Sequence, residues 1–229
     1  MKQADLLIFF CFQVVLGGYL WADTTIYWGE AKTPSGKIAY TERHTVISMN
    51  DVLKSTRTEY FDADRKKKIA VLDSDYSKSL SMPTYEFRDL RSSYREGVAM
   101  SDGKYMAYFK KQGEPKKSKE IKKGNRIFSG QGWHYYLIKN LDLLEKNDIV
   151  LNLILPSRLD FYQFNITRSE ASAGQIVAHL ELSNWLLSFF APSLRLVYDK
   201  KKKRLLEFRG VSNILDENGE QQEVIIRYE

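Results

Sequence analysis

The segment Ile38–Ile47, with the sequence IAYTERHTVI, changes side-chain type with a period of two. Such alternation is typical of a β-strand, because successive side chains of a strand point to opposite faces of the sheet. One face of this strand would carry Ile38, Tyr40, Glu42, His44 and Val46, and the other would carry Ala39, Thr41, Arg43, Thr45 and Ile47.

Short segments with the same alternation recur along the chain, separated by polar turns such as Ser101–Gly103 and Asn218–Gly219. Few helical stretches lie between them, which favours an antiparallel sheet over a parallel one. Aromatic residues make up 13% of the 229 residues, a composition that favours strands and argues against disorder. We expect further strands at Thr56–Phe61, Ile69–Leu72, Tyr85–Tyr94, Lys104–Lys110, Ile149–Leu155, Leu159–Arg168, Gln175–Leu182, Leu194–Tyr198, Arg204–Gly210 and Glu223–Tyr228.

Two segments have helical character instead. Residues 132–146 place Trp133, Leu137, Leu141 and Leu144 on one helical stripe, which predicts an amphipathic helix. Residues 184–190 follow Ser183 and are apolar almost all round. This second, shorter helix should therefore be buried, or face a ligand or a bilayer.

The N-terminal segment has the layout of a secretory signal peptide. Lys2 precedes an apolar run, Leu6–Leu20, and the small residue Ala22 follows it. We expect cleavage near Ala22, export to the periplasm and a single β-rich domain over residues 23–229; an uncleaved N-terminal anchor is the alternative. Cys11 is the only cysteine, so the mature chain would hold no disulfide and no thiolate metal site.

Basic residues are concentrated in a few short stretches of a chain whose net charge is +6. Residues 110–126 should form a long solvated loop, and residues 200–204 a hairpin tip. Both could contact an anionic membrane surface, or could simply keep exposed turns soluble and discourage edge pairing. Nucleic acid is not expected as a partner, because aromatic residues for base stacking are not interleaved with these clusters. The candidate anion contacts are Lys116, Lys117, Lys122, Lys123, Lys200, Lys201 and Lys202.

No motif predicts catalysis, a metal site or a cofactor. His44, His134 and His179 lie far apart and none has a companion at ligand spacing. The serine motif G-x-S-x-G is absent, and the two Asp-x-Asp triplets, at 62–64 and 73–75, suit turns at strand ends. We therefore expect a protein that is not an enzyme.

Four stretches resemble an uncharacterised family of exported bacterial proteins. They are GKIAYTE at 36–42, PTYEFRDLR at 83–91, LPSRLD at 155–160 and RLLEFRGVSNI at 204–214. The matches are spread over most of the mature chain, which implies one whole domain of that family. None of them is an active-site motif.

The segment from Tyr198 to Gly210, with its basic run and the pattern Leu-Leu-x-Phe-x-Gly, is more loosely similar to the half-barrel lipoprotein carriers of the bacterial envelope. That resemblance implies a mainly β (α+β) fold in which a strongly curved antiparallel sheet wraps over one longer and one short helix. It also implies a concavity that shelters acyl chains, although the same side chains could instead fill a packed core. The candidate ligand-binding residues are Trp133, Leu137, Leu141, Leu144, Trp185, Leu186, Phe189 and Phe190.

Two functions are compatible with these observations. The first is non-enzymatic binding of a lipid or other apolar ligand in the envelope, which requires a pocket with apolar and aromatic walls. The second is a periplasmic interaction or structural module with a solid core and no ligand. An enzyme would need titratable groups to converge from separate strands, which only a structure can show.

Overall fold

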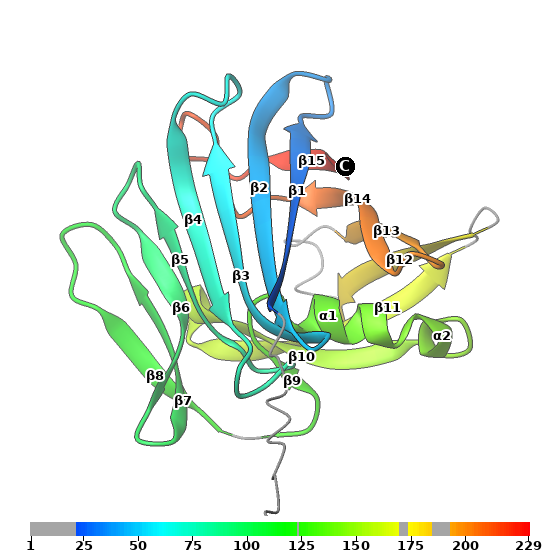
Figure 1. Ribbon diagram of the computed structural model, residues 1–229. Coiled ribbons are helices and arrows are strands. Elements are labelled where there is room, and N and C mark those ends of the chain that lie inside the picture. The colour runs from blue at the N-terminus through cyan, green and yellow to red at the C-terminus, as the bar shows by residue number, and fades with distance from the viewer. Residues whose placement is uncertain (1–21, 123, 170–173, 185–192) are drawn as a thin grey trace, which may run out of the picture.

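The computed structural model describes residues 22–122, 124–169, 174–184 and 193–229. Its main feature is one sheet of 15 strands, in the order β8-β7-β6-β5-β4-β3-β2-β1-β15-β14-β13-β12-β11-β10-β9 (Figure 1). Neighbouring strands are antiparallel except for the short parallel pair β9 and β10. The predicted mainly β, antiparallel fold class is thus confirmed. Among the helices of the described chain, none is long and apolar enough to cross a membrane.

The first eight strands run outward from the middle of the sheet to one edge. They are β1 (Ala22–Lys32), β2 (Ile38–Met49), β3 (Val52–Phe61), β4 (Lys68–Asp75), β5 (Thr84–Asp89), β6 (Arg95–Ser101), β7 (Lys104–Lys110) and β8 (Lys117–Ile121).

The other seven strands begin at the opposite edge and return to the middle. They are β9 (Ile127–Phe128), β10 (Ile149–Leu155), β11 (Asp160–Ser169), β12 (Gln175–Leu182), β13 (Leu194–Asp199), β14 (Arg204–Val211) and β15 (Glu223–Tyr228). The helices α1 (Gly132–Lys139) and α2 (Leu141–Leu144) lie between β9 and β10 in the sequence, and the short 3₁₀ helix η1 (Pro156–Arg158) follows β10.

The two edges of the sheet lie near each other. In a flat sheet of 15 strands they would be about 65 Å apart, because neighbouring strands are spaced by about 4.8 Å. The chain passes from Ile121 in β8 to Ile127 in β9 in six residue steps, which reach about 20 Å at most. Ile121 and Ile127 belong to one buried cluster, and the Lys119 ammonium lies 2.8 Å from the Asp160 carboxylate of β11. The sheet is therefore strongly curved and encloses its concave face.

The alternation predicted for β2 is present. Tyr40, Glu42 and His44 are buried on the concave face, whereas Arg43 points to the opposite face. Strand pairing places the side chains of β3 on the same two faces. Tyr60 pairs with Glu42 on the concave face, and Glu59 pairs with Arg43 on the opposite face.

Several expectations about individual strands need correction, and β6 and β9, like β1, were not predicted as strands. The strand β1 was not predicted; its first five residues are exposed, so its sequence lacks a clear buried face, and pairing with β2 and β15 defines it. The predicted strand Tyr85–Tyr94 ends at Asp89, because the Asp89 carboxylate accepts hydrogen bonds from Arg91 and fixes a turn. The predicted loop at 110–126 contains β8, which pairs with β7.

The predicted helix at 132–146 is divided into α1 and α2 at Asn140. The backbone of Asn140 leaves the helical region, with φ −120° and ψ 28°, and its side-chain amide donates to the carbonyl of Tyr136 at 2.7 Å. Both helices pack on the concave side of β10–β14 (Figure 1). The predicted short helix at 184–190 falls on residues 185–192, outside the described residues.

A loop between β14 and β15 covers one end of the concave face. Ile214 of this loop is 1% exposed, and the Ser212 and Tyr40 hydroxyls are 2.7 Å apart. Arg91 donates to the backbone carbonyl of Leu215, which attaches the loop to the turn after β5. The space that remains lies between this loop, the sheet and α1.

Candidate functional site

The concave face encloses a cavity of about 620 Å³. Its walls come from β1–β6, β10, β13–β15, α1 and the loop between β14 and β15, so strands from both halves of the chain contribute to it. This volume lies within the range of about 300–1,000 Å³ that is common for small-molecule sites. The curvature of the sheet therefore creates a space large enough for an organic ligand.

Aromatic side chains form much of the cavity wall, and each points inward from its strand or helix. Aliphatic side chains such as Leu72, Ile138 and Leu205 lie between them. Contacts with such walls favour the apolar body of a ligand over water. Aromatic lining residues include Tyr27, Tyr60, Phe87, Trp133, Phe208 and Tyr228.

A buried acid–histidine pair lies in the cavity wall on β2. The Glu42 carboxylate is 2.8 Å from His44 Nε2, and His44 Nδ1 is 3.0 Å from the Thr58 hydroxyl. A proton on Nε2 lets the ring donate to Glu42, and Nδ1 faces the Thr58 hydroxyl. The Tyr27 ring stacks on the imidazole at 4.5 Å between centroids.

The acid–histidine pair does not present a nucleophile to the cavity. Thr58 is 1% exposed and is not among the lining residues, so its hydroxyl is not available to a bound molecule. Its role in this arrangement is to orient the ring of His44, as a second hydrogen bond does for many functional histidines.

A second carboxylate, Glu96 of β6, also lines the cavity. Burial raises the pKa of Glu96, although the Tyr94 hydroxyl donates to it at 2.7 Å. His134 lies on α1, with Nδ1 3.0 Å from the Tyr198 hydroxyl. Burial, and to a smaller extent His44, lowers the pKa of His134 to about 4, so this imidazole is neutral near pH 7.

The cavity is open to solvent at one side. Five of its lining residues are exposed: Thr25, Lys203, Arg204, Asn213 and Glu229. Lys203 and Arg204 belong to the basic tip of the β13–β14 hairpin and are the cations among the described lining residues. A ligand that enters here passes these side chains before it reaches the aromatic walls.

The predicted ligand-binding residues divide into three groups. Trp133 lines the cavity. Leu137, Leu141 and Leu144 are at most 2% exposed and belong to the core that α1 and α2 form with β10–β13, so they support the wall rather than line it. Trp185, Leu186, Phe189 and Phe190 lie outside the described residues.

The predicted anion-contact residues lie on two separate hairpins. Lys116 and Lys117 belong to the β7–β8 hairpin, at the far left in Figure 1, and Lys122 follows β8. Lys200, Lys201 and Lys202 form the tip between β13 and β14, on the opposite side of that view. The structure therefore does not bring the two clusters together into one basic face, and Lys123 lies outside the described residues.

Several of these lysines already have partners. The Lys116 ammonium lies 3.8 Å from the centre of the Tyr108 ring. The Lys200 ammonium lies 2.7 Å from Glu145, and Lys117 lies 3.5 Å from Glu114.

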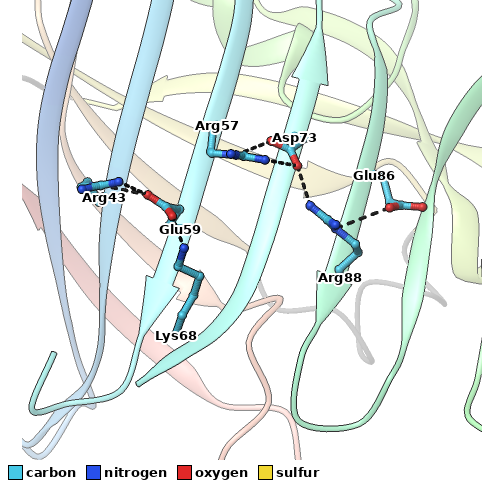
Figure 2. Close-up of polar contacts among 7 residues, drawn as sticks. All are labelled: Arg43, Arg57, Glu59, Lys68, Asp73, Glu86 and Arg88. Atoms are coloured by element: carbon cyan, nitrogen blue, oxygen red, sulfur yellow. Dashed lines mark hydrogen bonds and ion pairs between the residues drawn. The ribbon is translucent and has the colours of Figure 1, made fainter. Parts of the chain in front are cut away.

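The opposite face of β2–β5 carries two networks of ion pairs (Figure 2). In the first, Glu59 accepts from both Arg43 and Lys68. Burial alone would raise the pKa of Glu59, but the hydrogen bonds from Lys68 and Arg43 outweigh it and lower the pKa.

In the second network, Arg57 binds Asp73 through two nitrogens, at 2.6 and 3.1 Å, and Arg88 binds Asp73 at 2.7 Å. Arg88 also lies 3.4 Å from Glu86. Arg57, Asp73 and Glu86 line a groove on the outside of the sheet, but their charges are paired with one another and with Arg88. We therefore assign this face to stability and not to ligand binding.

The described residues hold no group of three or more His, Cys, Asp or Glu side chains placed to bind a metal ion. The Asp-x-Asp triplets have other contacts: the Asp62 carboxylate accepts from the backbone of Lys66 in a turn, and Asp73 belongs to the ion pairs above.

Sequence reasoning placed Glu42 and His44 on one face of a strand but did not identify them as part of a site. The available signal was the presence of an acid and a histidine among the otherwise apolar inward positions of β2. Comparisons with known proteins add no assignment: no protein-family model, curated protein or solved structure matches this chain.

Proposed function

We propose that this protein is a non-enzymatic binding protein that holds an apolar or amphipathic small molecule, such as a lipid, in the cavity of its curved sheet. The observation that carries the proposal is the cavity of about 620 Å³ with aromatic and aliphatic walls. Apolar walls with a few convergent polar groups are the usual composition of a small-molecule site.

The location that we propose is the bacterial envelope, after export. It rests on the charged start, apolar run and small residue of segment 1–22. The resemblance to exported bacterial proteins and to half-barrel lipoprotein carriers agrees with this location and with an apolar ligand.

The first test is native mass spectrometry of the protein purified gently from cells that export it, followed by solvent extraction. We expect a discrete additional mass that extracts as a lipid or other apolar compound. A clean unliganded mass from repeated preparations would overturn the proposal and favour an interaction module without a ligand.

A pair of variants links any bound mass to the cavity. Ile138→Trp combined with Leu205→Trp fills the space from α1 and β14, and both positions are half-buried cavity walls. Leu143→Trp combined with Val150→Trp adds the same two side chains at sites that are each 38% exposed. The first variant should lose most of the bound mass and the second should keep it, with circular dichroism confirming that both are folded.

A further inference from the structure

Glu42 is the most unusual residue of the cavity wall. It is 4% exposed, and only one of its carboxylate oxygens, Oε2, has a hydrogen-bond partner among the described residues, at His44. No described Lys or Arg forms an ion pair with it. Its ion-pair partner among the described residues is His44, which is a cation only when its ring is protonated. A buried carboxylate with no permanently charged partner is unfavourable, because burial removes hydration that little replaces.

Glu59 provides a comparison within the same sheet. It lies on β3 and is 5% exposed, yet it binds Arg43 and Lys68. The chain thus supplies two permanent cations to the buried glutamate on the outside of the sheet, but only His44 to the buried glutamate that faces the cavity.

Tyrosines surround Glu42. Register places Gly29 of β1 and Tyr60 of β3 on either side of it, and Tyr40 lies two residues away on the same face of β2. Gly29 also pairs with Tyr228, and a Cβ atom on Gly29 would lie 2.9 Å from the Tyr228 ring. The absence of a side chain at Gly29 therefore lets the Tyr228 ring lie over β1, beside Glu42.

The negative charge of Glu42 is close enough to act on these rings. Burial raises the pKa of Tyr27, Tyr40, Tyr60 and Tyr228, and Glu42 raises each of them further. All four tyrosines line the cavity together with Glu42. The rings pair at 6.1 Å between Tyr27 and Tyr228, and at 6.0 Å between Tyr40 and Tyr60.

We propose that Glu42 and its four tyrosines bind an organic ammonium group carried by the apolar ligand of the cavity. Aromatic faces attract ammonium ions through the ring quadrupole, and sets of tyrosine and tryptophan rings recognise quaternary ammonium groups in this way. A carboxylate within such a set adds the counter-charge that a desolvated cation needs. This inference rests on the proposed function and specifies its ligand.

The other charged groups of the cavity agree with a cationic ligand group. Glu96 adds a second acidic side chain, and His134 adds no positive charge near pH 7. Lys203 and Arg204 are exposed at the opening and do not neutralise the interior. The described cavity walls are thus aromatic and acidic, although the chain as a whole carries a net charge of +6.

Three probes of equal chain length test this proposal: decyltrimethylammonium, decanol and decanoate. Calorimetric titration of the full chain, freed of bound lipid and kept below the micelle concentration of each probe, gives their affinities. We expect decyltrimethylammonium to bind about tenfold more tightly than decanol, the size of a cation–π and ionic contribution of roughly 1.4 kcal/mol. Decanoate should bind most weakly.

Two variants then locate the ammonium site. Glu42→Gln should remove most of the preference for decyltrimethylammonium over decanol while leaving decanol binding in place. Glu30→Gln is the matched control, since Glu30 lies on β1 but points to the opposite face of the sheet, and it should keep the preference.

The possible outcomes separate this inference from the proposed function. Equal binding of the ammonium and decanol would overturn the ammonium site and leave an apolar binding protein. Failure of all three probes to bind would count against both. The comparison of probes on the unmodified protein remains decisive even if Glu42→Gln does not fold.

Discussion

Glu42 and Glu59 lie on neighbouring strands and differ in what the rest of the chain provides for them. Glu59 receives hydrogen bonds from two cations on the outer face of the sheet, whereas Glu42 faces the tyrosines of the cavity. The contrast makes separate predictions for the two carboxylates: Glu59 contributes to stability and Glu42 to ligand selection.

Replacing Glu59 by glutamine should lower the free energy of unfolding at pH 7 by about 1–3 kcal/mol, since it weakens two hydrogen bonds between charged groups. The folded-state pKa of Glu59 is below its ordinary value, so its stabilisation is complete above about pH 5 and is lost as the pH falls through the folded-state pKa. Urea unfolding at pH 7 and pH 3 should therefore show a large difference from wild type that shrinks in acid. Glu30→Gln, whose ion pair with Lys32 is exposed, is the control and should change stability little at either pH.

His134 also makes the protein less stable in acid, because burial favours its neutral form. Its folded-state pKa of about 4 lies below the value of about 6.5 expected in the unfolded chain. Between these values the unfolded chain binds the extra proton, so stability falls as the pH is lowered from 6.5 to 4. Wild type should lose up to about 3 kcal/mol more than His134→Gln over this interval, because one pKa unit corresponds to about 1.4 kcal/mol. Parallel stability curves for the two proteins would contradict the assignment.

At the scale of single elements, β6 depends on a close approach between backbones. A Cβ atom on Gly97 would lie 2.0 Å from the carbonyl oxygen of Tyr85 on β5. Gly97→Ala should therefore push β6 away from β5 and destabilise the protein by about 1–3 kcal/mol, the usual effect of overpacking. Ser101→Ala, at the exposed end of the same strand, should stay within about 0.5 kcal/mol of wild type in the same thermal or urea unfolding experiment.

The element β8 shows how the basic segment at 110–126 serves the fold. Its inner edge pairs with β7, and its lysines bind Glu114 and Asp160. Charged side chains on an edge strand discourage pairing with other chains. Lys117, which we predicted as an anion contact, is thus also explained by protection of the sheet edge.

At the scale of the whole molecule, the pairing of β1 with β15 joins the two halves of the sheet. Ala31 and Ile226 pair across this junction and are 0% and 4% exposed, so the junction lies within a core and not at a surface. Native-state hydrogen exchange should accordingly find the amides of β1, β2 and β15 among the most protected, and those of β8 and β9 among the least. Exchange at the β1–β15 junction as fast as at the edges would show instead that the halves open independently.

The alternation in the sequence determined the fold class and the face on which each strand residue lies. Tyr40, Glu42 and His44 could be assigned to one face of β2 because side-chain direction in a strand depends only on a local period of two. The amphipathic stripe of 132–146 likewise identified Leu137, Leu141 and Leu144 as buried, since helical spacing is also local. Composition and N-terminal layout gave the expectation of export.

Only the tertiary structure decided which inward residues line the cavity and which fill the core. That choice depends on pairings between distant segments, such as Gly29 with Tyr228, and on the curvature that brings β8 and β9 together. Neither is specified by a local pattern, because strand order and sheet closure follow from the burial of the whole chain. For the same reason Leu137 was a candidate ligand contact from its sequence, whereas Glu42 became one only when four tyrosines from four strands met around it.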